Sequence, residues 1–138
     1  MQTSTSAFSY RLMLSSASFS GILGVAFTFF PQEVLAQFGE ASSPMTTLAL
    51  QILGAFYVGL ALMNYTGKKA ILGGIYNRPL QMGNTVYCSI AAITLMKYMA
   101  GQSFIIAPAI MVVSLTYILL AASFLKLLFS SPVKEANG

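Results

Sequence analysis

Four long apolar stretches, almost free of charge, limit what this sequence can fold into. A helix needs about 20 apolar residues to cross the hydrocarbon core of a bilayer, and each stretch reaches about that length. Charge enters them only as Lys97 and Lys126, each close to the end of its stretch. We therefore predict one all-α integral membrane domain over residues 1–138, built as a four-helix bundle. The predicted spans are residues 12–30, 45–65, 80–100 and 103–129.

The charge content agrees with a membrane protein. Lys, Arg and Glu together make up 7% of the 138 residues, whereas a soluble domain carries about 25% charged residues and needs them to cover its surface. The first stretch is also longer than the apolar region of a secretory signal peptide, which is about 7–15 residues. We expect it to stay in the protein as a span.

The residue types that are missing exclude several kinds of chemistry. The chain has no His, no Trp and no Asp, and Cys88 is its one cysteine. Metal sites of His or paired Cys, Ser-His-Asp or Cys-His catalysis and an internal disulfide are therefore excluded. Glu33, Glu40 and Glu135 lie outside the apolar stretches, so active ion transport is not expected. We predict no catalytic, cofactor or metal site and no nucleic-acid partner. Whether the chain is an enzyme stays open, but its residues favour a non-catalytic role.

The distribution of charge predicts an orientation. With four spans, both termini and the loop between the second and third spans share one side of the membrane. That side receives six of the seven cations, and the opposite side receives Lys97 with Glu33 and Glu40. Because an excess of Lys and Arg marks the cytoplasmic side, both termini are predicted to be cytoplasmic. The six cations are Arg11, Lys68, Lys69, Arg78, Lys126 and Lys134.

Two connecting segments have patterns of their own. Residues 31–38 begin with Pro, which suits the first position of a helix, and Gly39 suits the cap at its end. We predict a short helix on the membrane surface, with a lid over a ligand cavity as the alternative. The loop 67–79 contains Lys68 and Lys69, which are either a topology anchor or a contact for anionic lipid or a partner.

Small and polar residues mark the faces where membrane helices meet, because lipid does not drive helices together. One such face carries Ser16, Ser20 and Gly24. A second carries Gly54, Tyr57, Ala61 and Asn64. A third carries Gln81, Asn84, Cys88 and Ala91, and the opposite side of that helix is apolar and suits lipid, with Met82, Val86, Ile90 and Ile93.

These faces place a polar cluster near the cytoplasmic side, for which two interpretations are open. The first is interhelical hydrogen bonding that fixes the register of the helices. The second is a headgroup pocket in which Arg78 pairs with phosphate. Elsewhere, the hydroxyl of Tyr117 in the fourth stretch needs a partner, and we expect a Ser or Thr from a neighbouring helix. The predicted cluster consists of Asn64, Tyr76, Arg78, Asn84 and Tyr87.

Several of these motifs carry a family resemblance. They are Leu53-Gly54-Ala55-Phe56-Tyr57 through Asn64, Gly73-Gly74-Ile75-Tyr76-Asn77-Arg78-Pro79 with Gly83-Asn84, and Phe30-Pro31 followed by Phe38-Gly39. Over about residues 12–100 the chain resembles small bacterial four-span proteins of the broad DoxX-like group. The resemblance implies a compact four-helix bundle in the bacterial cytoplasmic (inner) membrane. Some DoxX-type proteins are quinone-linked oxidoreductase subunits.

The function expected from these observations is a non-catalytic one. A chain with much packing surface and few reactive groups suits an accessory or interaction subunit, or a homo-oligomer. The expected partners are membrane lipids and either a larger membrane complex or further copies of the chain. The alternatives are a protein that binds a lipid or a quinone, with Asn64, Arg78 and Asn84 at the polar head, and a DoxX-like subunit of a membrane oxidoreductase.

Overall fold

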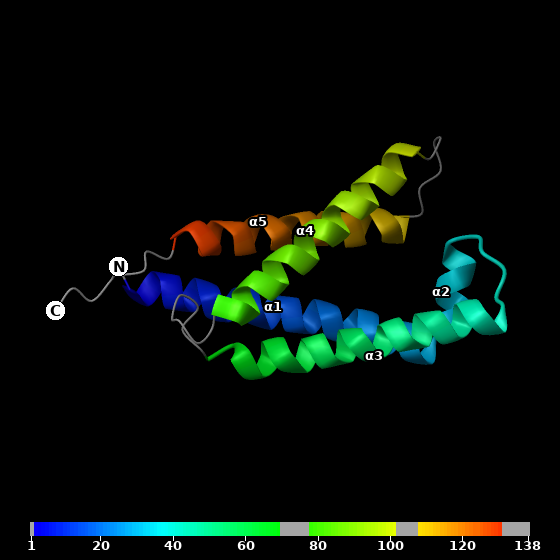
Figure 1. The fold of residues 1–138 in the computed structure, drawn as a ribbon, viewed down its shortest axis with the longest axis horizontal. Coiled ribbons are helices and arrows are strands. Elements are labelled where there is room, and N and C mark those ends of the chain that lie inside the picture. Colours follow the sequence, from blue (N-terminus) through cyan, green and yellow to red (C-terminus); the bar gives the residue numbers. More distant parts are fainter. Residues whose placement is uncertain (1, 70–77, 102–107, 131–138) are drawn as a thin grey trace. The chain divides into compact units, whose positions relative to one another are not determined.

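The structure is a computed structural model that describes residues 2–69, 78–101 and 108–130. This described part of the chain is all helical and contains no strand (Figure 1). Its helices are α1 (Gln2–Phe29), α2 (Pro31–Gln37), α3 (Pro44–Gly67), α4 (Arg78–Gly101) and α5 (Pro108–Ser130).

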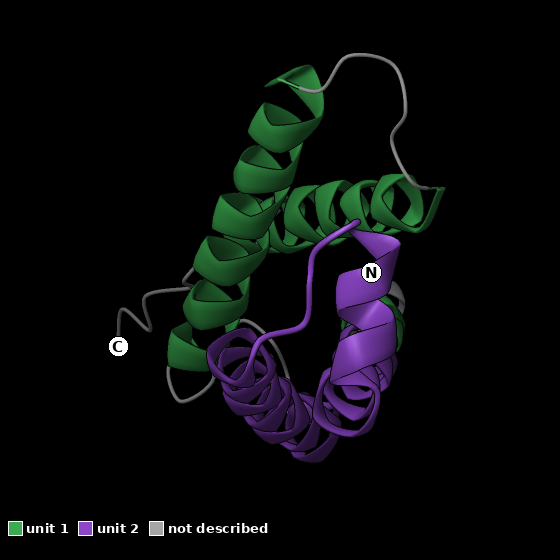
Figure 2. Cartoon of the chain, turned by 90° about the vertical axis from the view of Figure 1, so that its right-hand side faces the viewer, with its two compact units in different colours: residues 1–12, 69–138 green, residues 13–68 purple. Residues whose placement is uncertain are grey.

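The chain divides into two compact units, coloured separately in Figure 2. One unit consists of residues 13–68 and holds most of α1 together with α2 and α3. The other consists of residues 1–12 and 69–138 and holds the start of α1 together with α4 and α5.

A break after Phe29 separates α1 from α2. The backbone of Phe30 is not helical, with φ −126° and ψ 45°, and Pro31 occupies the first position of α2. At the other end of α2, Gly39 adopts a φ of 70°, its N–H donates to Ala36 O, and the N–H of Glu40 donates to Leu35 O. This is a Schellman cap. A helix in the predicted segment 31–38 is confirmed, ending at Gln37, and so is its glycine cap, whereas its place on the membrane surface stays a prediction.

A capping box starts α3. The Ser43 hydroxyl accepts the N–H of Thr46 at 3.1 Å, and the Thr46 hydroxyl accepts the N–H of Ser43 at 2.9 Å. Two backbone donors that the helix cannot satisfy internally are paired in this way. The capping box therefore defines where α3 begins after the α2–α3 connection.

In the unit of residues 1–12 and 69–138, α4 packs against α5. The buried side of α5 combines apolar side chains with two polar ones at spacings of three and four residues, as a single packed helix face requires. These buried residues are Ile110, Ser114, Tyr117, Leu120, Ala121, Phe124 and Leu127.

Polar side chains are buried in this protein while many large apolar ones are exposed. On α4, Gln81 and Asn84 are buried, whereas Val86, Ile90 and Ile93 are more than half exposed. The two sides of α4 are therefore arranged as predicted, apart from Ala91, whose neighbour Ala92 is the buried one. A helix in water would show the reverse pattern.

Three helices of the described residues are long and apolar enough to cross a membrane, and they indicate a membrane protein. The candidate spans are Ala7–Phe29, Pro44–Gly67 and Pro108–Phe129. The predicted third span, residues 80–100, is helical within α4, but α4 is not among these three.

Two helices have bounds that differ from those of the spans predicted in them. Helix α1 begins at Gln2, ahead of the span predicted from residue 12, and includes Arg11. The fourth predicted span began at residue 103, whereas α5 begins at Pro108 and residues 103–107 lie outside the described residues.

Candidate functional site

The contact between α1 and α3 is made backbone to backbone at two glycines. A Cβ atom on Gly24 would lie 2.8 Å from the backbone nitrogen of Val58, and one on Gly54 would lie 2.8 Å from that of Thr28. Neither position has room for a side chain. The small-residue faces predicted on these two helices therefore do meet, and they meet at their glycines, as small residues allow in membrane helices.

Toward the C-terminal end of α3 the same contact becomes polar. The Asn64 side chain donates from Nδ2 to the Ser16 hydroxyl at 3.0 Å, and both side chains are fully buried. Ser20, one turn along α1, is also fully buried, and its hydroxyl has no hydrogen-bond partner among the described residues. At the other side of the glycine contact, the rings of Phe27 and Tyr57 meet edge to face at 5.5 Å.

A pair of tyrosines links α4 to α5. The hydroxyls of Tyr87 and Tyr117 are 2.6 Å apart, and the two rings meet edge to face with their centroids 5.6 Å apart. The structure thus gives Tyr117 a tyrosine partner, where a Ser or Thr was expected. A second phenol satisfies the hydroxyl equally well and adds an aromatic contact. The signal that could have shown it was a second tyrosine, Tyr87, in the neighbouring span.

The buried face of α4 is polar along its first half. Asn84 donates from Nδ2 to Leu80 O at 3.0 Å, and the hydroxyl of Thr85 donates to Gln81 O at 2.8 Å. Gln81 is almost fully buried, and within the part of the chain that the structure describes its Nε2 has no hydrogen-bond partner. Cys88 is fully buried one turn farther on. This face offers amides, hydroxyls and one thiol, which can hold helices or a polar group but supply no general base.

Positive charge collects where α3 ends. The Lys68 ammonium lies 3.2 Å from the centroid of the Tyr65 ring, and Lys69 follows it as an exposed residue. The contribution of Tyr65 was missed from the sequence. Its signal was the spacing of three residues, which brings two side chains together on one side of a helix.

The predicted polar cluster is only partly described. Asn64 is bonded to Ser16, Asn84 to its own helix and Tyr87 to Tyr117, so each has a partner within its own unit. Arg78 is the exposed first residue of α4. Tyr76 and most of the loop 67–79 lie outside the described residues. A pocket shared by all five residues therefore remains a prediction.

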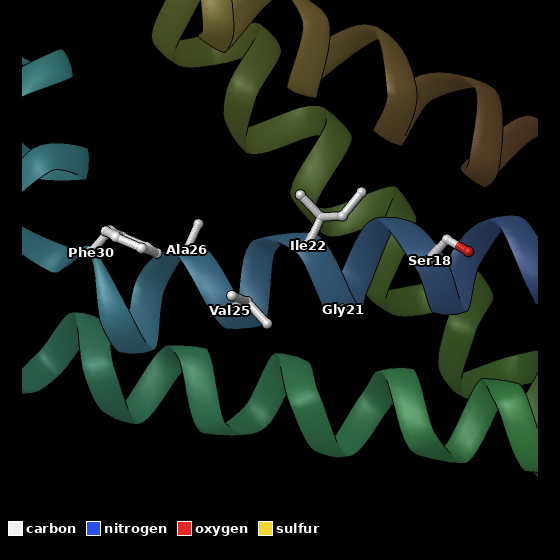
Figure 3. Close-up of a pocket in the computed structure, with 6 residues that line it drawn as sticks. All are labelled: Ser18, Gly21, Ile22, Val25, Ala26 and Phe30. Atoms are coloured by element: carbon white, nitrogen blue, oxygen red, sulfur yellow. The ribbon is translucent and has the colours of Figure 1, made fainter.

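A shallow apolar depression runs along one side of α1. Ile22 and Ala26 project there on the side away from α3 (Figure 3). The depression is open and almost wholly apolar, so it suits contact with hydrocarbon better than recognition of a polar ligand. Its lining residues are Ser18, Gly21, Ile22, Val25, Ala26 and Phe30.

Among the described residues, no group of three or more His, Cys, Asp or Glu side chains gathers where it could hold a metal ion. Comparison with known proteins finds no matching family model, no matching curated protein and no matching solved structure. The DoxX-like resemblance therefore stays a prediction.

Proposed function

We propose that this chain is a non-catalytic integral membrane protein that acts through its exposed helical faces, as an accessory or interaction subunit or as a homo-oligomer. The observation that carries the proposal is the exposure of α3. Only 6% of its most apolar stretch is buried, against 39% for α1 and 33% for α5. Such a helix needs lipid or another protein along most of its surface.

The described interior supports a packing role. Two of its polar contacts, Asn64 with Ser16 and Tyr87 with Tyr117, join one helix to another. Hydrogen bonds of this kind help to fix the register of membrane helices. The proposal assigns no cofactor. Binding of a quinone stays an alternative, and a role in a membrane oxidoreductase enters only through the resemblance.

The proposed arrangement has four spans, in which α4 crosses the membrane in addition to the three candidate spans. At about 1.5 Å per residue its 24 residues extend about 36 Å, more than the roughly 30 Å of hydrocarbon. Within residues 13–68, Lys68 lies at one end of α3, while Glu33 and Glu40 precede its other end. We place the Lys68 end and both termini in the cytoplasm of a bacterium, with α2 on the outer surface of the cytoplasmic membrane.

Native mass spectrometry after extraction in a mild detergent tests the proposal. We expect either a multimer of the 14.8 kDa chain or a stoichiometric second polypeptide. Phe56 on α3 is 74% exposed and Ile22 on α1 is 69% exposed, so they form a matched pair. Phe56→Ala should weaken the association, whereas Ile22→Ala should leave it unchanged. A wild-type chain that is always monomeric, under conditions that keep other membrane complexes intact, would contradict the proposal.

A further inference from the structure

The last turn of α3 fixes the position of a cation. The Lys68 ammonium lies 3.2 Å from the centroid of the Tyr65 ring, well within the range of a cation–π contact. Tyr65 is 53% exposed, so this contact forms at the surface of the protein. A lysine held in this way loses less conformational entropy when it meets an anion than a lysine that moves freely.

Lys68 keeps the capacity to bind a second group. An ammonium has three N–H donors, and a ring on one side of it leaves donors for other acceptors. Lys69 adds a second, exposed positive charge at the neighbouring position. No described carboxylate lies close to them in the sequence, because Glu33 and Glu40 precede the opposite end of α3. The charge of this cationic end, defined as Tyr65, Lys68 and Lys69, therefore remains uncompensated along α3.

The length of α3 places the cationic end at the level of lipid headgroups. The helix has 24 residues, or about 36 Å at 1.5 Å per residue. This exceeds the roughly 30 Å thickness of the hydrocarbon core. When α3 crosses the membrane, Lys68 at its C-cap therefore lies outside the hydrocarbon, where phosphate groups lie.

We propose that the cationic end binds the phosphate of an anionic phospholipid headgroup. Lys68, positioned by the Tyr65 ring, donates to the phosphate oxygens, and Lys69 contributes the second charge. A zwitterionic headgroup fits less well because it brings a cation of its own. Asn64 is excluded from this site, since it is fully buried in its bond with Ser16. The inference rests on the proposed function only in that α3 spans the membrane.

Competition between two lipids tests the site on the full-length protein. The purified chain receives equal amounts of phosphatidylglycerol and phosphatidylcholine, and native mass spectrometry gives the ratio of the two bound lipids. Because one lysine near the surface contributes about 1 kcal/mol toward anionic lipid, Lys68→Gln should lower this ratio about fivefold. Lys97→Gln and Lys126→Gln, which remove exposed lysines from other helices, should change it much less.

Tyr65 provides the sharper variant because its substitution alters no charge. Tyr65→Leu should lower the ratio about two- to fivefold, in line with the strength of a cation–π contact. Tyr65→Phe and Lys68→Arg keep the ring and the charge and should both retain the preference. Circular dichroism checks the helix content of each variant. If Tyr65→Leu loses helix, Tyr65→Phe becomes the deciding variant, and a changed lipid ratio in it would overturn the proposal.

Three results would overturn the site. They are an unchanged ratio in Lys68→Gln, an equal fall in Lys97→Gln, and displacement of phosphatidylglycerol by millimolar inorganic phosphate, which would identify a site for free phosphate. The proposed function fails in a different way. A chain that never associates in the same spectra contradicts the interaction role, whether or not phosphatidylglycerol is preferred.

Discussion

Asn64 of α3 donates its side-chain amide proton to the hydroxyl of Ser16 of α1 at 3.0 Å, and neither side chain is exposed. Together with the glycine contact between Gly24 and Gly54, this bond fixes how far α1 and α3 are shifted along each other. A buried polar pair between two membrane helices helps to specify one register.

Asn64→Leu should destabilise the protein by about 1 kcal/mol, because the bond is lost and the Ser16 hydroxyl is left buried. Chemical unfolding in detergent micelles measures the change. Thr66→Ala on the same helix is the control, since its exposed hydroxyl donates to carbonyls of its own helix, α3. In the double variant with Ser16→Ala the two losses should overlap, and fully additive losses would show that the two side chains do not interact.

Gly54→Ala should destabilise the protein by about 1–3 kcal/mol, since the new Cβ would lie 2.8 Å from the Thr28 backbone nitrogen and would force the helices apart. Gly59→Ala is the matched control on α3, because its Cβ would meet no atom within 4 Å. That change should be neutral or stabilise by up to about 1 kcal/mol through helix propensity. Equal thermal unfolding of the two variants would argue against the close contact.

Tyr87→Phe and Tyr117→Phe should each cost about 1 kcal/mol, because each leaves the remaining hydroxyl without the other. The ring contact survives in both variants. The double variant should cost little more than either single one, as expected when two groups share one bond. Tyr98→Phe, at an exposed position of α4, is the control. Additive losses in the double variant would contradict the hydroxyl pair.

Patterns along single helices could be predicted because their causes are local. Pro31 and Gly39 bound α2 through backbone geometry, and the alternation of polar and apolar sides on α4 follows the helical period. The first turns of α1 were missed because Ser and Thr at residues 3–6 carry no apolar signal, although the backbone continues its helical bonds there.

Partners across helices were harder to predict. The bond between Tyr87 and Tyr117 depends on the relative shift of α4 and α5, which no spacing within either helix determines. The Lys68–Tyr65 contact was different, because both residues lie on one helix. Their spacing of three residues could have predicted it, but the predicted cluster included Tyr76 and Arg78 from the region that follows and left out Tyr65.

Labelling with a membrane-impermeant thiol reagent tests the proposed orientation. Gln2→Cys and Ser42→Cys are made in a Cys88→Ala chain, which removes the only native thiol. In intact cells, position 42 should react and position 2 should react only after the membrane is opened. Labelling of position 2 from outside would reverse the assignment of the cationic side to the cytoplasm.

The collision accessibility of a nitroxide at position 56 tests membrane embedding most directly. Phe56→Cys in the Cys88→Ala chain is spin-labelled and reconstituted into phosphatidylcholine bilayers, with Glu40→Cys as the aqueous reference. Phe56 lies in the middle of α3 and is 74% exposed. Oxygen, which dissolves in lipid, should collide with this label more often than a water-soluble nickel chelate, and the order should reverse at position 40. Nickel collisions equal to or above those of oxygen at position 56 would show that α3 does not lie in the membrane.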